Sequence, residues 1–219
     1  MKEIIEYTNS EDFKFFGNLV MNNLNYNIPN SYVEIDIETE LNEAIKKWKI
    51  LAKNPIKIGC FEAYNFVNYR EITLMYKHPL LYSVCGNPVV CILEGMPINK
   101  LSFIGDLCVE IENKTGNWLT VNEIISGFNN LFEKKDLEGR FEKYPVNSNE
   151  EIFHFPKFLL ETIKIVCEKH SVIVKYVEEL SNAFNYQNQI LIFGNEIITG
   201  KNDVYLNQPH IIAEKFELL

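Results

Sequence analysis

The sequence is poor in glycine, with only 10 among its 219 residues. Phosphate-binding loops and many cofactor sites need glycine where the backbone must approach a ligand. The chain contains no GxGxxG, GxxxxGK[ST], GxSxG or HExxH motif and no EF-hand loop. It also has no run approaching 18 consecutive apolar residues. We therefore expect no bound cofactor, no metal site, no small-molecule ligand and no membrane-spanning segment.

The cysteines likewise do not indicate a reactive or metal-binding site. The five cysteines form no CxxC pair and have apolar neighbours; they are Cys60, Cys85, Cys91, Cys108 and Cys167. This pattern predicts buried free thiols in a reducing compartment. The first residues, MKEIIEYTNSEDF, lack the apolar core of a signal peptide. We therefore expect a cytoplasmic protein.

The composition is that of a folded globular protein, with 47% hydrophobic, 13% aromatic and 23% charged residues. The pattern of apolar residues predicts an α+β fold with a mostly antiparallel central sheet, formed by about residues 56–121 plus 189–199. Helices are expected near residues 10–24, 39–53, 120–135 and 156–170. We expect a single domain, 1–219, with a weak boundary at most in the charged loop 134–150.

Three local signals support these helices. Ser10 or Asn9 can cap the first helix, and Thr120 with Glu123 forms a capping box. The 39–53 helix depends on apolar residues at spacings of three and four; these are Leu41, Ile45, Trp48 and Ala52. Asn54-Pro55 follows and would end it.

The charge separates along residues 34–57. Five acidic residues come first, at Glu34, Asp36, Glu38, Glu40 and Glu43, and five lysines follow without an acid among them. The whole chain carries −9, so the chain without these lysines would carry −14. A compact basic segment in an acidic protein predicts a partner-binding site, for which we select Lys46, Lys47, Lys49, Lys53, Lys57 and Trp48.

On a helix, Lys46, Lys49 and Lys53 would share one stripe that can meet a row of phosphates. Trp48 would then be available to stack on a base. An alternative explanation involves no partner. Acids in the first turn and bases in the last turn complement the helix dipole, and Trp48 would belong to the core.

Other candidate residues carry less information. Asp106, Glu110, Glu112 and Lys114 are similar to a nuclease pattern of two carboxylates and a lysine, but on a strand they would form an exposed polar face. The four histidines show no zinc-site spacing.

Three functions fit the sequence. The favoured one is a non-enzymatic regulatory protein that docks on a large protein or ribonucleoprotein assembly, such as the ribosome. The second is an acidic, immunity-type inhibitor of a basic toxin or nuclease, steered to its target by the net charge of −9. The third is a small cytosolic enzyme whose active site is assembled from dispersed residues.

Overall fold

A computed structural model covers the 219-residue chain. The residues it describes are 1–61, 69–81, 84, 88–125, 128, 131–132, 150–180, 188–194 and 208–219. The chain divides into two compact units, unit 1 (Met1–Val84 with Tyr186–Leu219) and unit 2 (Cys85–Asn185). The expectation of a single domain, 1–219, stays a prediction. The loop 134–150, where we placed a weak boundary, lies outside the described residues apart from residue 150.

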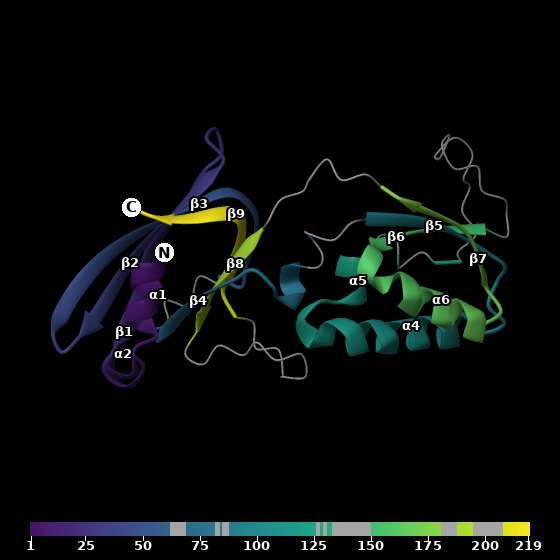
Figure 1. The fold of residues 1–219 in the computed structure, drawn as a ribbon, viewed down its shortest axis with the longest axis horizontal. Helices are drawn as coiled ribbons and strands as arrows, with labels where there is room; N and C mark the ends of the chain where they lie inside the picture. Colours follow the sequence, from purple (N-terminus) through teal and green to yellow (C-terminus); the bar gives the residue numbers. More distant parts are fainter. Residues whose placement is uncertain are drawn as a thin grey trace. The chain divides into compact units, whose positions relative to one another are not determined.

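Unit 1 is built on a six-stranded sheet in the order β1-β2-β3-β9-β8-β4, in which every neighbouring pair is antiparallel (Figure 1). Its elements are α1 (Lys2–Thr8), α2 (Glu11–Phe16), β1 (Asn18–Asn27), β2 (Tyr32–Leu41), β3 (Ala44–Gly59), β4 (Glu71–Met75), η1 (Pro79–Leu81), β8 (Gln189–Gly194) and β9 (His210–Leu218). The backbones of Leu19 and Tyr69 exchange two hydrogen bonds of 2.8 Å. These bonds join β1 to the segment before β4, so the sheet curls until its two edges meet.

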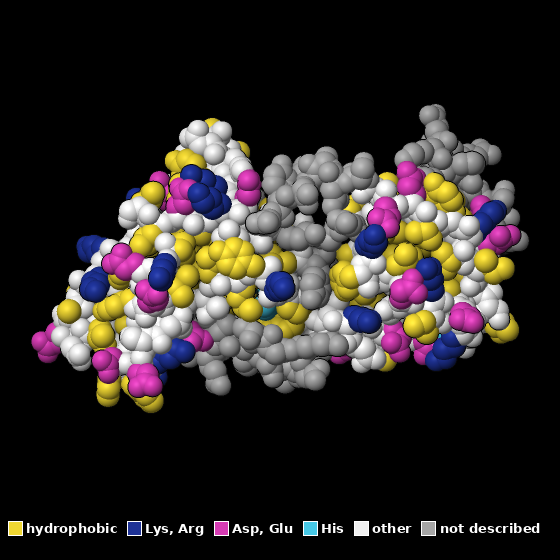
Figure 2. All heavy atoms as spheres, in the orientation of Figure 1, with side chains coloured by type: hydrophobic (Ala, Val, Ile, Leu, Met, Phe, Trp, Pro, Cys, Tyr) yellow, Lys and Arg dark blue, Asp and Glu magenta, His cyan; other side chains and the backbone are white. Residues whose placement is uncertain are grey.

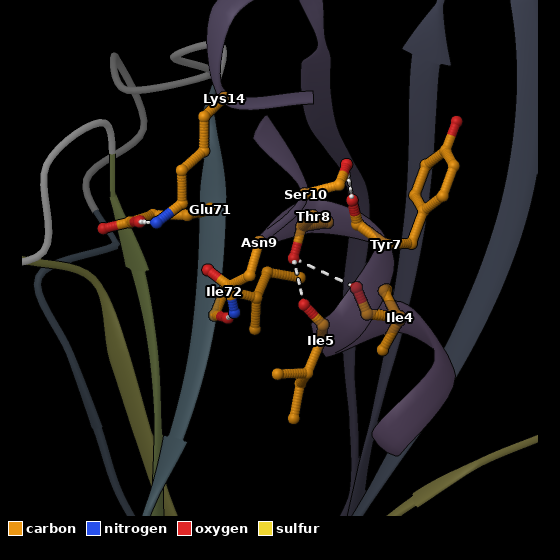
Figure 3. Close-up of polar contacts among 9 residues, drawn as sticks. All are labelled: Ile4, Ile5, Tyr7, Thr8, Asn9, Ser10, Lys14, Glu71 and Ile72. Carbon is orange, nitrogen blue, oxygen red and sulfur yellow. Dashed lines mark hydrogen bonds and ion pairs between the residues drawn. The ribbon is translucent and has the colours of Figure 1, made fainter. Parts of the chain in front are cut away.

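Helices α1 and α2 fill the concave side of this sheet. Ile4 and Phe13 are fully buried in the same core as residues from β2, β3 and β8. Asn9 Nδ2 donates to the carbonyl of Ile72 at 3.3 Å, and Lys14 lies 3.3 Å from Glu71. Figure 3 shows both contacts reaching from the helical segment to β4. The helices are thus anchored to the sheet by polar contacts at its rim as well as by the core.

The helix predicted over 10–24 is correct only in its first part. Ser10 caps α2 as expected, accepting a 3.3 Å hydrogen bond from the Phe13 amide. The helix ends at Phe16, because Gly17 is extended and β1 begins at Asn18. A Cβ on Gly17 would lie 2.4 Å from the Phe13 ring, so the close approach at this turn requires glycine.

The helix predicted over 39–53 is wrong, because this segment forms the end of β2 and most of β3. Asn42 and Glu43 both have positive φ, 51° and 65°, and connect the paired residues Leu41 and Ala44 in a two-residue hairpin turn. Asn42 suits that conformation. Within β3, the inward residues alternate at period two, so the spacing of three and four was a coincidence.

Unit 2 contains a three-stranded antiparallel sheet in the order β6-β5-β7. Its elements are β5 (Pro88–Glu94), α4 (Lys100–Thr115), η2 (Gly116–Trp118), α5 (Val121–Ile124), β6 (Glu150–Pro156), η4 (Lys157–Leu159), α6 (Leu160–Lys169) and β7 (Ile173–Glu179). Helices α4 and α6 lie next to each other on one side of this sheet (Figure 1). The core of the unit includes Phe103 and Leu107 from α4 and Ile163 from α6, all fully buried.

Residues 100–115 form the long helix α4 rather than the strand that we predicted within 56–121. Phe103, Leu107 and Ile111 are buried at a spacing of four, which is a helical period. The Asn99 side chain caps the helix by accepting a 3.1 Å hydrogen bond from the Ser102 amide. The Asn99 cap and the spacing of four between buried residues both specify a helix.

The fold class is confirmed as α+β with a large antiparallel sheet. The helix predicted over 156–170 is present as η4 followed by α6. The capping box at Thr120 is also present, and α5 ends at Ile124, where the next residue, Ile125, is extended. Most of the remainder of the helix predicted over 120–135 lies outside the described residues. Within the described ranges, no helix has both the length and the apolar character needed to cross a membrane.

The two glycines at positions 59 and 105 provide a matched test of packing. A Cβ on Gly59 would lie 2.4 Å from Cε1 of the buried His210, whereas one on Gly105 of α4 would meet no atom within 4 Å. We expect Gly59→Ala to lower the free energy of unfolding by about 1–3 kcal/mol through overpacking. Gly105→Ala should raise it by about 0.5–1 kcal/mol, because alanine favours a helix. Urea denaturation of both variants measures the free energy of unfolding. The same change in this free energy for Gly59→Ala and Gly105→Ala would contradict the close packing at Gly59.

Candidate functional site

The acidic and basic halves of residues 34–57 are brought together by the β2–β3 hairpin. Val33, Ile35 and Ile37 of β2 are buried, so the acidic residues between them face the other side of the sheet. The antiparallel register then places Glu38 opposite Lys47 and Asp36 opposite Lys49. A separation of charge along the sequence therefore becomes a pairing of charge in space.

We call this outer surface of unit 1 the charged face. Its members are Glu34, Asp36 and Glu38 of β2, Lys47, Lys49 and Lys53 of β3, and Lys215 and Glu217 of β9. Four carboxylates and four lysines make up this set, so the charged face is close to neutral. In Figure 2, dark blue and magenta side chains lie beside one another on the part of the molecule that carries β1, β2 and β3.

Each lysine of the charged face lies within ion-pair distance of a carboxylate. Lys47 Nζ is 3.2 Å from Glu38, and Lys49 Nζ is 3.5 Å from Asp36 and 3.7 Å from Glu34. Lys53 Nζ is 2.7 Å from Glu217, which Lys215 also contacts at 2.8 Å. The hydrogen bonds from Lys215 and then Lys53 lower the pKa of Glu217 to about 2. Glu217 is therefore ionised over the whole physiological range.

Lys46 and Trp48 lie on the opposite face of β3, toward the helices. Lys46 Nζ lies 4.1 Å from the centre of the Tyr7 ring of α1. The Trp48 indole packs against the core and donates from Nε1 to Thr39 Oγ1 at 2.8 Å. Its ring centre is 5.7 Å from that of Tyr7. Both side chains therefore contribute to the packing of α1 on the sheet.

The predicted binding residues are thus divided between two faces. Lys47, Lys49 and Lys53 are on the charged face, whereas Lys46 and Trp48 are on the other side of the strand. Lys57 follows an irregularity in β3 between Pro55 and Lys57 and lies opposite Ile212 of β9. The stripe of Lys46, Lys49 and Lys53 required a helix, and the strand does not form it.

The charged face presents exposed charges of both signs to solvent. No group of three or more His, Cys, Asp or Glu that could hold a metal ion occurs in the described parts of the chain. Exposed ion pairs are easily exchanged, because each contributes only about 0–1 kcal/mol and is screened by salt. Breaking any one of these ion pairs therefore costs little free energy.

Asp106, Glu110, Glu112 and Lys114 lie on α4 and not on a strand. Asp106 Oδ2 lies 2.7 Å from His170 Nε2 and 2.8 Å from Lys169 Nζ at the end of α6. Hydrogen bonds from Lys169 and then His170 lower the pKa of Asp106 below its usual value. This contact joins the two helices, and the positive residues also suit the C-terminus of α6.

The cysteines in the described ranges are reduced. Cys91 and Cys167 are buried as predicted, and burial raises the pKa of Cys167 to about 12 and that of Cys91 further. Such thiols stay protonated and are poor nucleophiles. Cys60 and Cys108 are partly buried, and Cys85 lies outside the described residues.

Two members of the charged face, Lys215 and Glu217, were missed by the sequence analysis. Their period-two spacing around the buried Phe216 is a strand signal. That signal does not reveal that β9 pairs with β3. The two strands are far apart in the sequence, since the hydrogen-bonded residues Asn54 and Glu214 are separated by 160 residues.

No known protein family matches this sequence, and neither a curated protein nor a solved structure matches the chain.

A double-mutant cycle on Glu38 and Lys47 tests the ion pairing of the charged face. We expect Glu38→Gln and Lys47→Gln to couple by less than about 1 kcal/mol at low salt, with the coupling largely lost at 1 M NaCl. Urea denaturation of the two single variants and the double variant gives the coupling free energy. The same cycle on Lys2 and Glu6, a more exposed pair 3.6 Å apart, is the control and should show a smaller value. A salt-independent coupling would contradict a solvent-exposed pair.

Proposed function

We propose that this protein is a non-enzymatic binding protein that docks on a large macromolecular assembly and regulates or blocks it, using the charged face of unit 1. The observation that carries this proposal is the outer surface of β2, β3 and β9, where alternating acidic and basic side chains remain accessible. The Lys47 side chain, for example, is 80% exposed and its partner Glu38 is 35% exposed.

The pairing of the lysines favours a protein surface as the docking partner. An RNA backbone presents one sign of charge and binds best to an excess of lysine or arginine. The charged face has equal numbers of both signs among its ion-paired members. A protein surface that carries complementary charges of both signs matches this arrangement better and fixes a docking register. Within a ribonucleoprotein, we infer that the contacts are with its protein components.

A second candidate is an acidic inhibitor of a basic protein, such as a nuclease toxin. The specific observation that favours it is that the four lysines of the charged face are matched by four carboxylates. The net charge of −9 therefore resides entirely on other residues. This excess would accelerate association with a positive partner without using the lysines.

The two candidates differ in the effect of reversing charge on the charged face. We expect Lys47→Glu/Lys49→Glu to abolish co-migration of the protein with a large particle in size-fractionated lysate of its source. The new carboxylates would repel Glu38 and Asp36 on β2. They would also remove the positive charges that the partner is proposed to contact. Lys157→Glu/Lys164→Glu is the matched control. It changes the net charge equally, and its two lysines form exposed pairs with Glu179 and Glu161 in unit 2.

Circular dichroism checks that both variants remain folded. Cross-linking of the bound protein to a protein component of the particle supports a protein contact, and cross-linking to RNA alone contradicts it. If wild type and both variants instead bind one small basic protein, the acidic inhibitor is supported. If all three migrate as free protein, both candidate functions are wrong.

A further inference from the structure

The Lys46 ammonium group lies over two aromatic rings. Its Nζ is 4.1 Å from the centre of the Tyr7 ring of α1 and 5.8 Å from that of the Trp48 ring of β3. Both distances are within the range of about 6 Å over which a ring face attracts a cation. Within the part of the chain that the structure describes, Lys46 forms no ion pair, in contrast to its neighbour Lys47. The two rings therefore already hold an ammonium group without the help of a carboxylate.

Both rings are fixed in position by other contacts. The Trp48 indole donates from Nε1 to Oγ1 of the fully buried Thr39 at 2.8 Å. The centre of the Tyr7 ring is 5.2 Å from that of the fully buried Phe13 and 5.7 Å from that of Trp48. Figure 3 shows that the Tyr7 ring projects on the side of the helical segment away from Glu71. Because the rings are already ordered, a ligand that binds to them does not have to order them.

The Lys46 side chain can leave the rings without disturbing the core. Tyr7 and Trp48 are partly buried and pack on the core, whereas Lys46 is exposed. An exposed contact between a cation and a ring is weak, so the loss of this one costs little free energy. The position over the two rings is therefore open to another cation that competes with Lys46.

The chemistry of the two rings favours a methylated ammonium group. A primary ammonium is strongly hydrated and carries three N–H donors, which a ring face does not accept as an oxygen atom does. A methylated ammonium has fewer of these donors or none, and proteins recognise such groups with aromatic rings. Glu3 lies four residues before Tyr7 on the same side of α1, so a cationic ligand would approach past a carboxylate. The net charge of −9 also attracts a cation.

We propose that Tyr7 and Trp48 form a binding site for a methylated ammonium group, which Lys46 occupies when no ligand is bound. We call the two rings the aromatic site. It lies on the face of β3 opposite the charged face, and its operation does not depend on the proposed docking partner. The group is carried either by a small compound of the choline type or by a methylated lysine side chain, since both present the same cation to the rings.

An NMR titration of the full chain with choline chloride at constant ionic strength tests the aromatic site, with the indole N–H of Trp48 as the reporter. We expect a saturable shift of this signal in the millimolar range of choline. The indole of Trp118, which is 3% exposed in unit 2, is the internal control and should not shift. The neutral alcohol in which a tert-butyl group replaces the trimethylammonium group of choline should bind roughly tenfold more weakly, because it has no charge.

Variants of two adjacent lysines separate the aromatic site from general electrostatics. Lys46→Gln should strengthen choline binding roughly threefold to sixfold, because the contact that it removes keeps the rings occupied for most of the time. Lys47→Gln is the matched control, since it removes the same charge from the other face of β3, where Lys47 pairs with Glu38. It should change the affinity by less than about twofold. Both lysines are exposed, so both variants should fold.

Two results would overturn the proposal. One is equal binding of choline and its neutral analogue, which would show that the rings do not select a cation. The other is the lack of a saturable Trp48 shift in Lys46→Gln, which would leave the Lys46 contact as a link between β3 and α1 only. The amide of N-acetyl-trimethyllysine is the second probe. Tighter binding of this probe than of choline supports a site for a methylated protein, and the reverse supports a site for a small ammonium compound.

Discussion

The antiparallel pairing of β2 with β3 is the constraint on which the rest of unit 1 depends. The turn at Asn42 and Glu43 sets the register, and a shift by one residue would move Ile35, Ile37 and Ile50 from the core to the solvent. The same register places the acidic residues of β2 beside the lysines of β3. Core formation and charge pairing are therefore two consequences of one turn.

This coupling explains why the lysines do not form an independent positive patch. The backbone hydrogen bonds and the buried face determine the position of each strand, and the charged side chains then meet across it. Exposed pairs of this kind contribute little to stability. Under the proposed function, their role is the pattern of charge that they present to a partner. Such a surface would select a partner whose own charges match that pattern.

Buried polar groups in unit 1 have a different role from the exposed charges. His78 and His210 are enclosed with backbone partners at the end of β4 and the start of β9. A change in protonation there acts on packing directly, because an enclosed charge cannot be solvated. The protein thus combines exposed charges that are individually weak with buried imidazoles whose charging would be costly.

The sequence by itself determined those features that depend on neighbouring residues. The α+β class, the Ser10 cap, the capping box at Thr120 and the helix after Pro156 were all predicted correctly. Each signal lies within a few residues, where local hydrogen bonding and period set the structure.

Only the tertiary structure decided how the segments pair. Residues 39–53 carry apolar residues at both helical and strand spacing, and pairing with β2 selects the strand. Phe103, Leu107 and Ile111 became a helix face because the core of unit 2 lies on that side of α4. The contacts of Lys53 with Glu217 and of Gly59 with His210 join positions far apart in the chain. Such contacts depend on long-range packing, which no local pattern of residues encodes.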